Sequence, residues 1–269
     1  MTKGSRPPAR PERSEAGSSS DRTGLERVQK TLARAGYGSR RGAEDLIREG
    51  RVRIGERVAE LGDRVDPLRD RILVDGVPVP SHPGLRYFVL NKPAGVTTTL
   101  RDAHAARSVA ELMPPGPRLF PVGRLDRESE GLLLLTNDGD LAHRLQHPRY
   151  GVEREYLAEV PGSVPRSALR RLTEGVALED GPARAVRVAI EESGRARTAL
   201  TIVMTEGRKR EVRRMLAAIG FPARRLARTR IGSVRLGTLR PGQTRSLTAP
   251  EVAELYRLTR LHRAVPTNP

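Results

Sequence analysis

The sequence predicts an α+β protein, in which a small unit of two helices and short strands is followed by a mixed or largely antiparallel sheet. Three observations support this class. Apolar residues recur with helical spacing in two short stretches at residues 25–50. Most segments after residue 83 instead have the apolar and β-branched character of strands. The few later helices are spread irregularly among these strands, unlike the regular alternation of a parallel α/β fold.

The smaller unit is predicted at residues 24–82. Apolar residues share one face of a first helix that ends at Gly36, and Ser39 is a typical N-cap for a second helix that ends at Gly50. Alternating residues next predict a short strand, and RILVDGVPV at 71–79 predicts two strands joined by an Asp-Gly turn. Two helices and a few short strands therefore make up this unit.

The larger unit is predicted at residues 83–262, after a linker at the sequence HPG. Strands are expected in five segments: 87–93, 132–135, 152–160, 183–190 and 198–207. Helices are expected in three segments: 140–146, 210–220 and 250–262. This mixture predicts a sheet that is mixed or largely antiparallel, with helices packed on it.

A charged turn precedes the most apolar stretch of the chain. GRLDRESEG at 123–131 runs directly into four leucines, which are apolar on both faces and therefore predict a central strand. Because loops held by rigid elements often present functional groups, Asp126 is a candidate for a carboxylate held in a fixed position. The alternative is a turn aspartate whose side chain bonds its own backbone.

Composition narrows the function classes. The chain has 49 Lys and Arg against 32 Asp and Glu, a net charge of +17, which predicts a polyanionic partner. An arginine-rich surface that reflects composition alone is the alternative. The lack of cysteine excludes disulfides, thiolate nucleophiles and Cys-bearing metal sites. No stretch is apolar enough for a membrane span or a signal peptide, so we expect a cytoplasmic protein.

Both ends of the chain are expected to lack structure. Residues 1–23 are rich in Pro, Gly, Ser and Arg and poor in large apolar side chains, which predicts a disordered basic tail. Residues 263–269 are expected to form a short flexible tail. The folded part of the chain is therefore predicted at residues 24–262.

The second predicted helix begins with Arg40 and Arg41, directly after its cap. Free backbone N–H groups and two guanidinium groups there favour a phosphate-binding edge, and a solvated helix start is the alternative. The run AGYGSRRGAEDLIREGRV resembles the S4-type RNA-binding domain, over residues 24–80. The usual Val-Asn-Gly turn of that family is replaced here by Gly55 and Glu56. The resemblance implies that this unit docks structured RNA.

Four further blocks resemble the RsuA family of ribosomal RNA pseudouridine synthases in order and spacing. They are NKPAGV (91–96), GRLDRESEGLLLLTNDG (123–139), REYLAEV (154–160) and EGRKREVRRML (206–216). Members of this family also have the amino-terminal RNA-binding domain. The resemblance implies an isomerase that detaches the base of a uridine, rotates it and rejoins it through carbon 5. It implies no cofactor and no metal.

By motif position, the resemblance makes Asp126 the essential carboxylate, either as a nucleophile or as a base on a transient glycal. This carboxylate must stay ionised under a flipped-out base, although burial raises the pKa of carboxyl groups. The resemblance implies that Arg213 opposes such a shift as the ion-pair partner of Asp126, with Arg214 as the competing candidate. The arginine that does not pair is expected to face phosphate. Glu211 stands where the family often has glutamine and adds an acid beside this pair.

The resemblance also assigns roles around the base. Tyr156 would stack on the flipped base and Val212 would pack beneath it, and a core tyrosine is the alternative for Tyr156. Arg124 would hold the displaced RNA backbone or fill the gap that the base leaves. Lys92 would contact a phosphate, or its motif would mainly shape the sheet.

The implied partner is ribosomal RNA, with large-subunit RNA favoured, and we expect a monomer that binds no membrane. The modified uridine is left open. The alternative is a noncatalytic RNA-binding or ribosome-assembly factor that keeps the fold. A zinc site at His143 and His147 is disfavoured, because Arg144 stands where a catalytic glutamate would be and no third ligand is evident.

Overall fold

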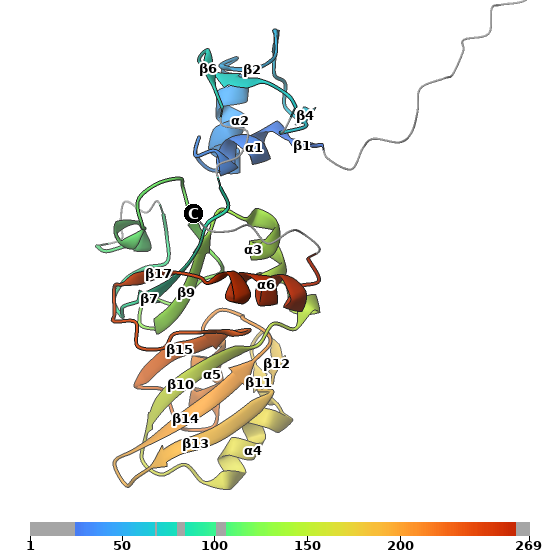
Figure 1. Cartoon of the computed structure of the whole chain (residues 1–269). Coiled ribbons are helices and arrows are strands. Elements are labelled where there is room, and N and C mark those ends of the chain that lie inside the picture. The colour runs from blue at the N-terminus through green and yellow to red at the C-terminus, as the bar shows by residue number, and fades with distance from the viewer. Residues whose placement is uncertain (1–24, 68, 80–83, 101–105, 262–269) are drawn as a thin grey trace, which may run out of the picture. The chain divides into compact units, whose positions relative to one another are not determined.

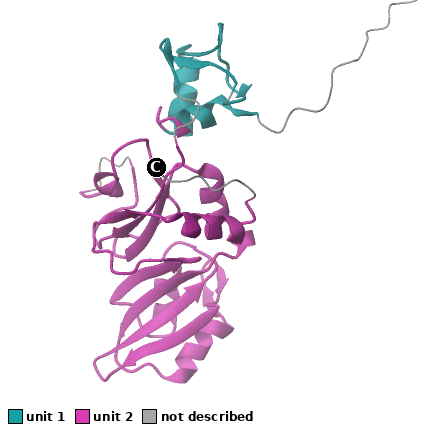
Figure 2. Cartoon of the chain, in the orientation of Figure 1, with its two compact units in different colours: residues 1–33, 39–81 teal, residues 34–38, 82–269 magenta. Residues whose placement is uncertain are grey.

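The computed structural model describes residues 25–67, 69–79, 84–100 and 106–261 (Figure 1). The chain divides into two compact units (Figure 2), one comprising residues 1–33 and 39–81 and the other residues 34–38 and 82–269. The predicted tails at 1–23 and 263–269 lie outside the described residues, and so does most of the predicted linker. Among the described residues, no helix is both long and apolar enough to cross a membrane.

The first unit contains the two predicted helices and short antiparallel strands. The helices are α1 (Val28–Arg34) and α2 (Arg40–Arg48). Four strands form one sheet in the order β3 (Arg57–Val58), β2 (Val52–Ile54), β5 (Ile72–Val74) and β6 (Val77–Pro78). A separate pair consists of β1 (Glu26–Arg27) and β4 (Arg64–Val65).

Local sequence explains how these elements end and turn. The Ser39 hydroxyl accepts a hydrogen bond from the amide of Gly42 at 3.1 Å, as expected for the N-cap of α2. The predicted Asp-Gly turn joins β5 and β6 with both residues in the left-handed region. Gly55 also has a positive φ and, with Glu56, closes a two-residue hairpin between β2 and β3. The departure from the usual family turn therefore leaves the hairpin intact.

A mixed sheet, with nine strands among the described residues, is the centre of the second unit. Its main path runs in the order β13 (Arg187–Ser193), β14 (Arg197–Met204), β10 (Arg154–Pro161), β15 (Arg225–Ile231), β9 (Glu130–Thr136), β7 (Tyr87–Lys92) and β17 (Thr244–Ser246). Two short strands pair beside this path: β8 (Phe120–Pro121) and β16 (Val234–Arg235). The pairing of β15 with β9 is parallel and the other pairings are antiparallel. The predicted sheet type is thus confirmed.

In the part of this unit that the structure describes, four α-helices and two short 3-10 helices accompany the sheet. They are α3 (Gly139–Gln146), α4 (Arg166–Glu174), α5 (Glu211–Ala218), α6 (Ala249–Leu258), η1 (Val109–Leu112) and η2 (Pro148–Tyr150). Helices α3, α5 and α6 match the three predicted ones, and α6 ends before residue 262, where the prediction ended. Helix α4 was not predicted because only Ala168 and Leu172 of its residues are buried, so few apolar residues mark it in the sequence.

The leucine run forms β9 in the middle of the sheet, as predicted. Leu133 and Leu135 pack in one apolar cluster together with residues of α4 and α5. Leu132 and Leu134 pack in a second cluster together with residues of α3 and α6. Figure 1 shows these two helices beside β9. Because helices cover both faces, this strand is apolar without alternation. It gives the charged turn before it a rigid support.

The prediction of one continuous strand at residues 183–190 is wrong. The first residue of this segment ends β12 (Gly181–Ala183), which pairs with β11 (Val176–Leu178), residues 184–186 lie in no strand, and β13 begins at Arg187. Between them the amide of Ala185 donates to the carbonyl of Leu172 at 2.7 Å, so the chain leaves the sheet to contact the end of α4. The two extra strands are β11 (Val176–Leu178) and β12 (Gly181–Ala183).

Candidate active site

An open cavity of about 910 Å³ lies beside the charged turn that precedes β9. Its volume falls in the upper part of the range of small-molecule sites, roughly 300–1,000 Å³. The turn itself, strands β10 and β15, and the segment leading into α5 line the cavity. Four residues predicted from the sequence are among its lining residues: Arg124, Asp126, Tyr156 and Val212.

One row of paired residues crosses the sheet at this cavity. Lys92 of β7 pairs with Gly131 of β9. Gly131 also pairs with Arg228 of β15, which in turn pairs with Tyr156 of β10. Because paired residues on neighbouring strands point to the same face, Lys92, Arg228 and Tyr156 share a face of the sheet. Two buried cations therefore lie on either side of a glycine.

Gly131 is required by the close approach of β15. A Cβ atom at this position would lie 2.8 Å from the backbone nitrogen of Arg228, and the residue has a φ of +97°. Any other residue at this position would collide with the backbone of β15 and would have to adopt a left-handed backbone, so it would require the strands to shift. The last glycine of GRLDRESEG thus lets β15 bring Arg228 against the turn.

Asp126 is half-buried, and it lines the cavity. Its backbone carbonyl accepts a hydrogen bond from the amide of Ser129 at 3.0 Å, which closes the turn. Among the described residues, no hydrogen bond or ion pair reaches its carboxylate. The expected alternative, a side chain bonded to its own backbone, is therefore not observed. The carboxylate remains available to a ligand in the cavity.

Lys92 supports this turn from inside the protein, so the phosphate contact predicted for it must be corrected. Its side chain is 0% exposed. Its Nζ donates to the carbonyls of Pro93 and Val96 at 2.9 and 2.7 Å and reaches the carbonyl of Arg127, the neighbour of Asp126, at 3.5 Å. Burial lowers the pKa of Lys92 to about 8, and the negative charge of Asp126 opposes this shift.

Arg213 lies against the same turn, but the predicted direct ion pair with Asp126 is absent among the described residues. Its Nε donates to the hydroxyl of Ser129 at 3.2 Å, Nη2 to the carbonyl of Glu128 at 3.0 Å and Nη1 to the carbonyl of Ala223 at 3.1 Å. Each guanidinium nitrogen is thus engaged. Burial lowers the pKa of Arg213, and the charges of Glu128 and Asp126 oppose that shift. Arg213 therefore holds the turn and acts on Asp126 through space.

Arg214, the competing candidate, pairs with another carboxylate. Its two terminal nitrogens donate to Asp180, both at 2.9 Å. A pair with Asp126 does not fit this arrangement, so that expectation for Arg214 is corrected, whereas its contact with a phosphate stays a prediction. Glu211 is buried and pairs with Arg208 at 2.8 Å rather than with Arg213. The acid that replaces the family's glutamine, at the start of α5, is thus paired with an arginine three residues before it.

Tyr156 and Val212 face the cavity from β10 and α5. They are 9% and 6% exposed and also belong to the apolar cluster on this side of the sheet. Tyr156 is therefore both a core residue and a cavity wall, which joins the two interpretations of the sequence. Arg124 is exposed where the turn begins. Their roles toward a base or a nucleic-acid backbone stay predictions.

In the first unit, Arg40 and Arg41 are the exposed first residues of α2. Arg40 lines a shallow hollow of about 350 Å³ together with other charged side chains of this unit, among them Arg27 and Arg64. Glu26 and Glu44 also line this hollow, and the phosphate contact of Arg40 stays a prediction. The role of Arg41 stays a prediction.

Comparison with known proteins reveals what these units are. The family model of RNA pseudouridylate synthases matches residues 86–218, and that of the S4 domain matches residues 26–72. An uncharacterised RNA pseudouridine synthase of Mycobacterium leprae is 48% identical over 239 residues, which cover 87% of this chain and 93% of that protein. The chain belongs to the RNA pseudouridylate synthase family. It is therefore an isomerase that acts on RNA, and the predicted RsuA-type organisation with an S4 domain is confirmed.

Two further comparisons support this pseudouridine synthase assignment. Ribosomal large subunit pseudouridine synthase B of Bacillus subtilis is 40% identical over 239 residues, 87% of this chain and 97% of that protein. A crystal structure of a pseudouridylate synthase matches with a TM-score of 0.59 and 28% identity, over 85% of this chain and 99% of that one. The fold and the sequence thus point to the same family over nearly the whole described chain.

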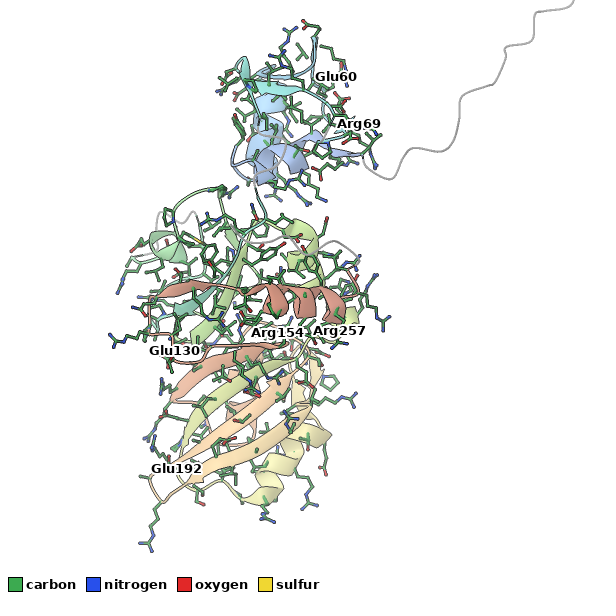
Figure 3. The ribbon with its side chains drawn as sticks, viewed as in Figure 1. Glu60, Arg69, Glu130, Arg154, Glu192 and Arg257 are labelled. Carbon is green, nitrogen blue, oxygen red and sulfur yellow. The ribbon has the colours of Figure 1, made fainter. Side chains whose placement is uncertain are left out.

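Sequence reasoning missed two buried arginines of this synthase, both of which line the cavity. Arg154, labelled in Figure 3, begins β10 and donates to the carbonyls of Leu145 at 2.8 Å and Thr205 at 3.0 Å. It alternates in phase with the buried Tyr156, a signal that identifies it as buried. Arg228 lies in β15, which the sequence did not predict because three arginines interrupt its apolar residues. No local signal finds Arg228.

Proposed function

We propose that this enzyme converts one uridine of large-subunit ribosomal RNA to pseudouridine, with Asp126 as the essential carboxylate. The relative from Bacillus subtilis, named for the ribosomal large subunit, supports the substrate class. The S4 domain supports docking of RNA. The monomeric state, the cytoplasmic location and the absence of a cofactor stay predictions from the sequence.

One observation carries this proposal. In the described chain, the carboxylate of Asp126 lines the cavity without a hydrogen bond or ion pair of its own. Its turn is nevertheless held by Lys92 from β7 and by Arg213 from α5. An acid that is rigidly supported, yet unpaired in a large cavity, is suited to act on a bound ligand. This is the arrangement that covalent or general-base catalysis by a carboxylate requires.

The surrounding side chains fit a flipped nucleotide. Extruding a base costs a few kcal/mol, and stacking on an aromatic ring returns about 1–3 kcal/mol. Tyr156 and Val212 supply an aromatic and an apolar wall for such a base. Arg228 in the cavity lining and Lys92 behind the turn are buried positive charges, which favour negative charge on a ligand beside them. Nucleophilic attack on the sugar and proton abstraction to a glycal both remain open to this carboxylate.

Mapping pseudouridine in ribosomal RNA tests the proposal. RNA from cells with and without the gene would be labelled with carbodiimide and read by primer extension. We expect one large-subunit position to lose its pseudouridine without the gene and to regain it with the wild-type protein but not with Asp126→Asn. Glu128→Gln is the matched control, because this exposed acid stands in the same turn outside the cavity lining. Restoration by Asp126→Asn, or a change confined to other RNA, would contradict the proposal.

A further inference from the structure

Arg228 is a buried cation without a matching acid. It is 3% exposed, and its Nε donates to the carbonyl of Leu132 at 2.8 Å. Its Nη2 is buried and has no hydrogen-bond partner in the described part of the chain. No carboxylate lies within ion-pair distance of it among these residues. Because burying an unpaired charge is costly, such a group needs an explanation.

Two other cations stand near Arg228. Burial lowers the pKa of Arg154, and the positive charge of Arg228 adds to that shift. Burial also lowers the pKa of Lys92, to about 8, and Arg228 again acts in the same direction. Among the described residues, the hydrogen bonds of Arg154 and Lys92 run to backbone carbonyls, which carry no full charge. Arg154 and Arg228 line the cavity, and Lys92 lies beside the turn. The other acids of the lining, Glu206 and Glu211, both pair with Arg208, so Asp126 is the unpaired acid among the described lining residues and the site has room for one more negative charge.

The location of Arg228 indicates which part of a bound nucleotide would carry that negative charge. It pairs with Tyr156 across β10 and β15, so the two side chains are neighbours on one face of the sheet. Tyr156 is the residue proposed to stack on the flipped base. An arginine beside the stacking ring, in the cavity lining, is therefore beside the base rather than at the RNA backbone.

The chemistry of the reaction supplies an anion at this place. The bond between C1′ of the ribose and N1 of uracil breaks, and its electron pair stays on N1. At the same time, C1′ bonds an oxygen of Asp126, or C2′ gives a proton to Asp126 and a glycal forms. By either route the detached uracil carries a negative charge, shared by N1 and the two carbonyl oxygens.

The second half of the reaction consumes this anion. The rotated base forms a bond from C5 to C1′, and the step at Asp126 is reversed. C5 then loses its proton and N1 gains one, so pseudouridine is neutral. The negative charge on the base exists only between the two bond changes, which is when a fixed positive charge accelerates the reaction.

We propose that Arg228 is a catalytic residue that stabilises the detached uracil anion beside Tyr156. This inference rests on the proposed function, because it requires uridine chemistry at Asp126. It assigns to β15 a role that neither the motif resemblance nor the contacts of Asp126 provide. Arg228 would act on the base, whereas Lys92 and Arg213 hold the turn.

Arg228→Met tests this role, because methionine keeps much of the side-chain volume and removes the charge. The probe is a short RNA that contains the modified uridine, used in single-turnover reactions at saturating enzyme. Loss of one preorganised charge-stabilising group costs about 10²–10³-fold in rate. We expect a loss of that size, with the dissociation constant and salt dependence of RNA binding unchanged, and partial recovery in Arg228→Lys.

Arg230→Met is the matched control. Arg230 lies on the same strand but pairs with Glu153 at 2.9 Å and Glu155 at 3.2 Å, outside the cavity lining. The same substitution there removes a charge from β15 without touching the base, so the single-turnover rate is expected to stay near that of the wild type. Circular dichroism of all variants verifies folding, and Arg228→Lys provides the rate comparison if Arg228→Met fails to fold.

A second readout separates stabilisation of the anion from a structural role. RNA with 5-fluorouridine at the target position releases a base whose negative charge is already stabilised by fluorine. If Arg228 stabilises the uracil anion, the rate loss in Arg228→Met is smaller for consumption of 5-fluorouridine than for uridine. An equal loss on both substrates, an unchanged rate, or a matching loss of RNA affinity with a flatter salt dependence would overturn the inference. A wild-type protein that forms no pseudouridine would instead refute the proposed function.

Discussion

At the scale of single residues, the site is built from groups whose neighbours decide their roles. Lys92 and Arg228 carry the same charge, stand in the same row of the sheet and flank Gly131. The ammonium group of Lys92 donates three hydrogen bonds to backbone carbonyls around the Asp126 turn. One guanidinium nitrogen of Arg228, in contrast, has no hydrogen-bond partner among the described residues. Lys92 is therefore a structural support, and Arg228 is the candidate for contact with substrate.

Substituting Gly131 tests the close approach of β15. Gly131→Ala adds a Cβ atom that collides with the backbone of Arg228, so we expect a loss of about 2–4 kcal/mol in the free energy of unfolding. Gly123→Ala is the control, because Gly123 also has a positive φ but meets only the side chain of Gln146, at 3.7 Å. Urea denaturation measures the free energy of unfolding of both variants and of the wild type. Equal losses would show that backbone strain alone explains Gly131.

The pH dependence of stability tests the burial of Lys92. Because its pKa is lowered from 10.5 to about 8 in the folded protein, the unfolded state binds more protons between these values. The free energy of unfolding therefore rises with pH from about 8 to 10.5, by up to about 3 kcal/mol from this group. Burial raises the pKa of Tyr87, which lowers stability above pH 10 in every variant.

Subtracting the pH profile of Lys92→Met from that of the wild type removes the contribution of Tyr87. The difference is expected to rise across this interval and to level off above it. A flat difference would mean that the three carbonyl contacts keep the ammonium group as basic as in the unfolded chain.

At the scale of elements, the sequence predicts a helix or strand correctly where the residues of that element alone indicate its type and its burial. Four consecutive leucines are apolar on both faces, so a central strand follows without knowledge of its neighbours. The same holds for α5, whose apolar residues recur at helical spacing. Helix α4 buries few residues, and β15 owes its position to a parallel pairing with a strand almost a hundred residues away. Neither the burial of α4 nor the long-range pairing of β15 can be predicted from a local sequence pattern.

The candidate site divides in the same way. The motifs predicted Asp126, Tyr156 and Val212 as site residues because each lies in a segment with a distinctive sequence, and the fold places all three in one cavity. Which arginine of α5 lies against the Asp126 turn could not be predicted, since Arg213 and Arg214 are neighbours on one helix and only the tertiary contacts distinguish them. Arg213 bonds the turn, whereas Arg214 bonds Asp180. Arg228 was missed together with its strand.

The two arginines of α5 provide a test of how this helix positions the turn. Arg213→Ala removes the hydrogen bonds to Glu128 and Ser129, so we expect the single-turnover rate to fall by about 10²-fold, as small displacements of a catalytic group do. Arg214→Ala loses only its pair with Asp180 and should keep a rate near that of the wild type. Equal effects of the two changes would contradict a direct role of Arg213 at the turn.

At the scale of the whole molecule, the net charge of +17 and the S4 unit concern binding of RNA rather than chemistry. Changing Arg40 and Arg41 together to alanine is expected to weaken RNA affinity and to lower the salt slope by about 0.7–0.9 for each lost phosphate contact. The single-turnover rate at saturation should not change. Filter binding over a series of salt concentrations measures the slope.

A double variant of Arg48 and Arg51 is the control for this change. It removes the same charge from the same unit, but Arg48 pairs with Asp45 at 2.6 Å and Arg51 pairs with Glu49 at 3.1 Å. Arginines already engaged by carboxylates are expected to contribute less to the slope. If both double variants flatten the salt dependence equally, general charge rather than the start of α2 governs binding.

The central claim is that the unpaired carboxylate of Asp126 performs the isomerisation. The most direct measurement is pseudouridine formed in a single turnover by Asp126→Asn on RNA bound to the same extent as by the wild type. The substitution keeps the shape of the side chain and removes its charge. We expect no pseudouridine above background with RNA affinity nearly unchanged, and formation at the wild-type rate would contradict the account.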